Sequence, residues 1–93
     1  MNKEQLKEAI DAKVSKYIWA NYDSSINSIS AAEHVIAIGK SILYDKHQIM
    51  SGGGFVSAFN RNDLRMAHAT ADVDISKNIG LLLNMSWNIQ LYD

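Results

Sequence analysis

The sequence predicts an all-α fold, a small single-domain bundle of four to five helices with short middle ones, spanning residues 1–93. Two observations carry this prediction. Apolar residues recur at three- and four-residue spacing toward both ends of the chain, as in amphipathic helices. Between these segments the breaks are glycines and short polar runs, since the chain has no proline.

The first helix is predicted over residues 3–20. Its apolar face carries Leu6, Ile10, Val14, Tyr17 and Ile18. Charged residues of alternating sign occupy the remaining positions, which is typical of a solvated face. Residues 21–30 are rich in Asn, Asp and Ser, whose side chains bond to nearby backbone groups, so this stretch favours a loop.

A second helix is predicted from Ser30 until it fades near residues 45–48. Ser30 and Glu33 fit a capping box, in which the serine accepts from the Glu33 amide and the carboxylate reaches back to the Ser30 amide. The buried stripe is expected to carry Val35, Ile36, Gly39, Ile42 and Leu43. A glycine inside a helix costs ~1 kcal/mol relative to alanine. We therefore expect a close helix crossing at Gly39, where no side chain holds the backbones apart.

The strongest break in the chain is Ser51–Gly54. A short helix or turn follows, with Phe55, Val56 and Phe59 on one side. Asn62 or Asp63 is suited to N-cap a helix over 64–71. In the alternative interpretation, two strands within residues 42–59 form a hairpin through the glycines.

The segment Asp72–Asp74 offers an N-cap for a last helix from about Ile75 to Gln90. Its buried stripe is expected to carry Ile75, Ile79, Leu82, Leu83 and Ile89.

The composition excludes several classes of function. Nine basic and ten acidic residues give a net charge of −1, so no broad basic field for duplex nucleic acid is expected. The absence of cysteine excludes disulfides, a thiolate zinc site and a thiol nucleophile. The apolar runs are too short to span a bilayer, and the charged N-terminus does not look like a signal peptide. We therefore expect a cytoplasmic protein without membrane contact.

The first candidate binding feature is the glycine run. Gly53 and Gly54, just before the helix expected at Phe55, let backbone N–H groups converge on an anion such as a phosphate. No Gly-Lys-Ser/Thr follows, so this is not a P-loop. A flexible turn between helices is the alternative interpretation.

A second candidate feature follows it. Arg61 and Arg65 can hold a phosphate bidentately, and Asn62 and Asp63 can bind a base or ribose edge. The alternative is a solvated arginine pair and a helix cap. The aromatic residues able to stack on a nucleobase are Trp19, Phe55, Phe59, Trp87 and Tyr92.

Neither a metal site nor a catalytic site is expected. His68 and Asp72 lie four residues apart, but no third metal ligand is evident. No nucleophile elbow, carboxylate pair or Ser/His/Asp order is present, so the sequence predicts a protein that is not an enzyme and uses no cofactor.

The second half of the chain, residues 47–92, resembles a group of small bacteriophage and prophage proteins. The shared pattern is a glycine pair and an aromatic-bearing short helix, then Asn-Asp-Leu, an alanine, Ala-Asp and a terminal helix. The matching positions are Gly53, Gly54, Phe55, Asn62, Asp63, Leu64, Ala67 and Asp72. The chain departs from the pattern at Asp74–Ser76, and its first 46 residues match little.

The resemblance implies a function in immune evasion. The group is similar to viral sponges, which sequester the nucleotide signals of anti-phage defence systems such as CBASS and Thoeris. It implies that the chain binds a cyclic nucleotide or cyclic-ADP-ribose-type signal without cleaving it, in the cytoplasm of an infected bacterium. The expected ligand-binding residues are Gly53, Gly54, Phe55, Arg61, Asn62, Asp63, Arg65 and Trp87. The alternative is a small phage protein that inhibits or assists another protein through a helix face.

A homo-oligomer is expected on physical grounds. A core of this size is marginal alone, and apolar and aromatic residues continue up to Tyr92, more than a few short helices can cover.

Overall fold

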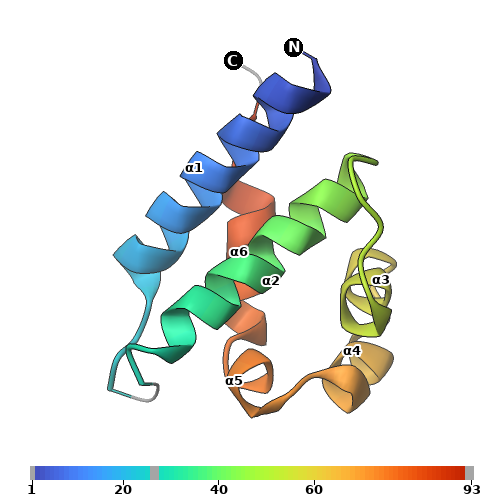
Figure 1. Cartoon of the computed structure of the whole chain (residues 1–93). Coiled ribbons are helices and arrows are strands. Elements are labelled where there is room, and N and C mark those ends of the chain that lie inside the picture. Colours follow the sequence, from blue (N-terminus) through green and yellow to red (C-terminus); the bar gives the residue numbers. More distant parts are fainter. Residues whose placement is uncertain (1, 26–27, 92–93) are drawn as a thin grey trace.

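The computed structural model describes residues 2–25 and 28–91, and these ranges hold six helices and no strand (Figure 1). The helices are α1 (Lys3–Asn21), α2 (Ala31–Lys46), α3 (Gly54–Asn60), α4 (Leu64–Thr70), α5 (Val73–Ser76) and α6 (Ile79–Asn88). The all-α prediction is confirmed. The hairpin alternative is wrong, because residues 42–46 belong to α2 and residues 54–59 to α3.

The long helices α1 and α2 pack side by side, and α6 lies behind them in Figure 1. The two short helices α3 and α4 pack on each other, and α3 also contacts α2. Because α2 touches α1, α3, α5 and α6, it is the central element of the bundle.

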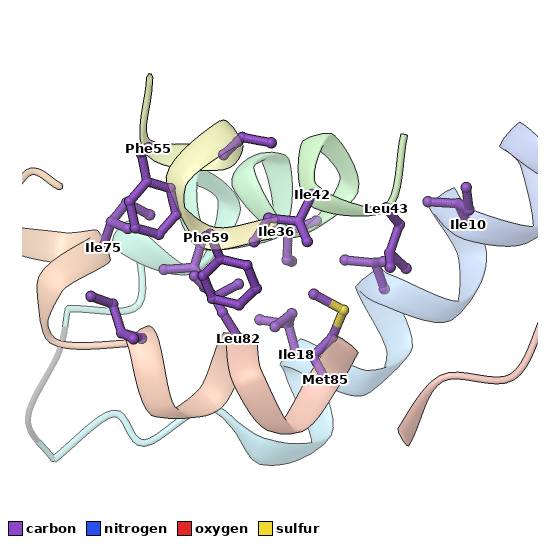
Figure 2. Close-up of a cluster of buried hydrophobic side chains, with 14 of the residues drawn as sticks. Ile10, Ile18, Ile36, Ile42, Leu43, Phe55, Phe59, Ile75, Leu82 and Met85 are labelled. Atoms are coloured by element: carbon purple, nitrogen blue, oxygen red, sulfur yellow. The ribbon is translucent and has the colours of Figure 1, made fainter. Parts of the chain in front are cut away.

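The core forms where the apolar faces of these helices converge (Figure 2). It includes the predicted stripes of α1 and α2, except that Tyr17 is only half-buried at the edge. Phe55 and Phe59 of α3 pack with tilted rings at a centroid distance of 5.8 Å. Gly39 marks a close approach of helices. A Cβ atom there would lie 3.0 Å from Cγ1 of Val14 in α1 and 3.4 Å from Cε of Met85 in α6. The predicted close crossing is therefore present, and it involves three helices.

The capping box predicted at Ser30 is wrong. Ser30 has helical dihedral angles (φ −63°, ψ −24°) and makes no side-chain cap, whereas a capping residue has an extended backbone. The amides of Ala31 and Ala32 donate instead to the carbonyl oxygens of Ser28 and Ile29, both at 3.1 Å. A backbone turn thus leads into α2 in place of the expected cap, and Ser30 itself takes part in the helical turn.

The capping box lies instead at the start of α1. The side chain of Asn2 accepts from the Gln5 amide at 2.8 Å, and the Gln5 side chain accepts from the Asn2 amide at 3.1 Å. We expect Asn2→Ala to lower the free energy of unfolding by about 0.5–2 kcal/mol. Ser30→Ala and Glu33→Ala should change it by less than about 0.5 kcal/mol. Urea titrations of the three variants check this, and a Ser30→Ala loss as large as that of Asn2→Ala would contradict it.

The last helix begins later than predicted. Asp72 does act as an N-cap, but of the single turn α5, and the chain then leaves the helix at Lys77–Asn78 before α6 begins. The cause is Asn78, whose side chain is 4% exposed and donates to the carbonyl oxygen of Asp74 at 2.7 Å. Its own amide donates to Ile75 three residues back, which tightens the turn.

The predicted stripe of this segment is partly right. Ile75, Ile79 and Leu82 are buried, whereas Leu83 and Ile89 are only half-buried. Met85, which lies outside the predicted stripe, is fully buried in the core.

Candidate functional site

A hollow of about 320 Å³ opens between the end of α2, the end of α3 and the second half of α6. Its size lies near the lower end of the roughly 300–1,000 Å³ typical of small-molecule sites. The residues that line it are Lys46, Phe59, Asn60, Asn62, Leu83, Ser86 and Trp87. Of the predicted ligand-binding residues, Asn62 and Trp87 are here.

Three helix ends bring these residues together. Lys46 is the last residue of α2, and Asn60 the last of α3. Asn62 has a positive φ of 63°, a left-handed conformation that asparagine tolerates better than most residues, and it turns the chain from α3 toward α4. Trp87 lies in the last turn of α6 with 86% of its surface exposed. An indole this exposed is free to stack on a planar ligand.

The side chain of Asn60 is held in place by a hydrogen-bond network with α2. Its Nδ2 donates to the carbonyl oxygen of Ile42 at 3.0 Å and to Oδ2 of Asp45 at 2.9 Å. The other carboxylate oxygen of Asp45 accepts from the Gly52 amide at 3.3 Å. This network joins α2, the glycine run and α3, so the position of Asn60 is set by three segments.

The lining of the hollow favours an anion. It contains one cation, Lys46, and no carboxylate. The Lys46 side chain is exposed and makes no hydrogen bond or ion pair with another described residue. Burial, and secondarily the neighbouring Lys46, lowers the pKa of His47, which favours the neutral form of this imidazole. The charge offered to a ligand is therefore that of Lys46.

The predicted glycine site lies apart from the hollow. Gly53 caps α3, so a helix does follow the glycine run as predicted. Neither Gly53 nor Gly54 has a positive φ, and Phe55 is buried against Phe59 as a core residue. Gly52 is required by close approach, because a Cβ there would lie 2.3 Å from Cγ1 of Val56.

The two arginines do not converge on the glycines. Gly54 starts α3 beside Thr70 at the end of α4, whereas Arg61 follows the end of α3, about 10 Å away along the helix. Arg61 lies 3.7 Å from Oδ2 of Asp63 and 3.3 Å from the Ser57 hydroxyl. Arg65 is exposed on α4.

Asp63 is a helix cap, which was the alternative to its predicted role in ligand binding. Its carboxylate accepts from the Met66 amide at 3.0 Å and N-caps α4. Tyr92, the last aromatic residue considered for stacking, lies outside the described residues.

Asp72 contacts His34, and not His68, the histidine that the sequence spacing pairs with it as a possible metal ligand. Its Oδ2 lies 2.6 Å from Nε2 of His34 on α2, and its Oδ1 accepts from the Ile75 amide at 2.9 Å. Within residues 2–25 and 28–91, no group of three His, Asp or Glu side chains is placed to hold a metal ion.

The Asp72 contacts predict a pH dependence. The Ile75 amide, and then His34, lower the pKa of this carboxyl below its ordinary 3.8, so the ionised form stabilises the fold above that pH and the stabilisation is lost as the pH falls through the lowered pKa. Asp72→Asn keeps an acceptor for the cap but removes the charge near His34, whereas Asp72→Ala removes both.

We expect the alanine variant to be the less stable of the two at pH 7, and both to lose less stability than the wild type below about pH 4. Melting temperatures measured between about pH 7 and about pH 2 check this. Parallel pH profiles for wild type and Asp72→Asn would contradict it.

No protein-family model, no curated protein and no solved structure matches the chain. Among the described helices, none combines the length and the apolar character needed to cross a membrane.

Proposed function

We propose that the chain binds a nucleotide-derived signal in the hollow and withholds it without cleaving it, as a phage protein acting in the cytoplasm of an infected bacterium. The observation that carries the proposal is the composition of the hollow, which combines the exposed indole of Trp87, the cation of Lys46 and the amides of Asn60 and Asn62. Aromatic faces stack on bases, cations bind phosphates, and amides bind base edges.

The experiment that tests this function is retention followed by release. The protein is incubated with a panel of cyclic mononucleotides, cyclic dinucleotides and cyclic ADP-ribose, separated from free ligand, and denatured by heat. We expect one class to be retained and recovered intact. Recovery of a converted product would indicate an enzyme instead, and no retention of any member would overturn the proposal.

A second candidate function is supported by exposed apolar side chains around α4 and α5. Leu64, Met66 and Val73 are 44%, 45% and 69% exposed, and exposed apolar side chains that gather into one patch mark a surface that meets another protein. In this second candidate function, the chain binds a host or phage protein through a helix face and inhibits or assists it. The same panel separates the two functions, because a protein-binding factor retains no nucleotide.

We also propose that the chain forms a homo-oligomer. The hollow is small for a cyclic dinucleotide, and a neighbouring subunit would cover the ligand surface that one chain leaves open. Light scattering at micromolar concentration is expected to give a multiple of the 10.4 kDa chain mass. A mass near that of a single chain would contradict this.

A further inference from the structure

The side-chain amide of Asn60, a residue that lines the hollow, has a fixed orientation of donor and acceptor. Both partners of the Asn60 Nδ2 group, the Ile42 carbonyl oxygen and the Asp45 carboxylate, are acceptors only. The amide of Asn60 therefore cannot be turned over, because its carbonyl oxygen would then face two other oxygens. The orientation of this asparagine is determined by its surroundings.

The atom left over is the Oδ1 acceptor of Asn60. No hydrogen bond among the described residues uses it. It is also not enclosed, since no buried side-chain oxygen or nitrogen in residues 2–25 and 28–91 lacks a partner. Asn60 lines the hollow, and with both Nδ2 hydrogens used, Oδ1 is the one polar atom of this side chain left for a ligand there.

We infer that the hollow selects nucleobases that present an N–H donor, either an exocyclic amino group or a ring N–H, over bases that present none, through Oδ1 of Asn60. This inference rests on the proposed function and assigns its base specificity. A base without a donor would cover the acceptor and leave it unpaired, and an unpaired acceptor shielded from water is costly. Lys46 and Trp87 do not discriminate in this way, because a cation binds any phosphate and an indole stacks on any base.

The test compares two ligands that differ only in the donor. Adenosine 5′-monophosphate carries an exocyclic amino group, and purine riboside 5′-monophosphate has hydrogen in its place and no N–H on the base. Calorimetric titration of the wild-type protein is expected to give a Kd at least about tenfold lower for the adenine nucleotide. Equal Kd values would overturn the specificity while leaving nucleotide binding intact. Binding of neither at millimolar concentration would overturn the proposed function in this hollow as well.

Two variants assign the selectivity to a residue. Asn60→Ala is expected to bring the ratio of the two Kd values close to one, whereas Lys46→Gln should weaken both ligands alike and leave the ratio unchanged. Circular dichroism checks that each variant folds. A ratio that persists in folded Asn60→Ala would overturn the inference, and if that variant does not fold, the wild-type ligand pair still decides it.

Discussion

Replacing Leu82 by alanine is expected to lower the free energy of unfolding by about 2–5 kcal/mol. Leu82 is fully buried on α6, and its Cδ2 lies 3.6 Å from the position that a Cβ of Gly39 would occupy. The helices α1, α2 and α6 already meet there at close range, so they cannot close further over a cavity. Against the 5–15 kcal/mol typical of a domain, such a loss is large.

The matched control is Leu81→Ala, one residue earlier on the same helix. Leu81 is only half-buried at the edge of the core, so its truncation removes fewer contacts and should cost clearly less. Urea denaturation of the two variants measures the difference. Equal losses would contradict the orientation of α6 that buries Leu82 and leaves Leu81 at the edge of the core.

Removing both Trp87 and Lys46 is expected to weaken nucleotide binding by roughly 10²–10⁴-fold. Stacking contributes ~1–3 kcal/mol per base, and a hydrogen bond to a charged group ~1.5–3 kcal/mol. Both side chains are exposed, so Trp87→Ala and Lys46→Gln should leave the fold intact. Calorimetry of the double variant with the retained nucleotide measures the loss.

The matched variant is Arg61→Ala/Arg65→Ala, which removes two exposed cations that do not line the hollow. We expect it to bind the nucleotide within about threefold of wild type, because it leaves the lining unchanged. The opposite pattern, with binding lost in the arginine variant and kept in the Trp87/Lys46 variant, would place the site at the arginines, as the sequence motif alone suggests.

Local rules were enough to predict much of the fold. The period of Leu6 to Ile18 predicts α1, the glycine run predicts the break before α3, and Asp63 predicts the start of α4. Each prediction depends on residues a few positions apart, which is the range over which helix periodicity and capping act. The Ser30 prediction failed within this same range, because Ser30 adopts helical instead of extended dihedral angles and its side chain makes no cap.

Local rules predicted less of the candidate site than of the fold. Asn62 and Trp87 were selected as polar and aromatic residues near the motif, but Lys46 and Asn60 were not. Nothing in the residues next to Lys46 or Asn60 signals a shared hollow, since they belong to different helices and meet Trp87 only through packing.

The sequence by itself determined that this chain is helical, where its long helices begin and end to within a few residues, and that Gly39 marks a crossing. Only the tertiary structure decided that Asn78 divides the last helix, that Met85 is in the core, and that Asn60 has one possible orientation. The physical reason is the separation along the chain of the residues that interact. Periodicity and turns depend on neighbours along the chain, whereas the burial of Asn78 and the acceptors around Asn60 exist only once distant segments have packed together.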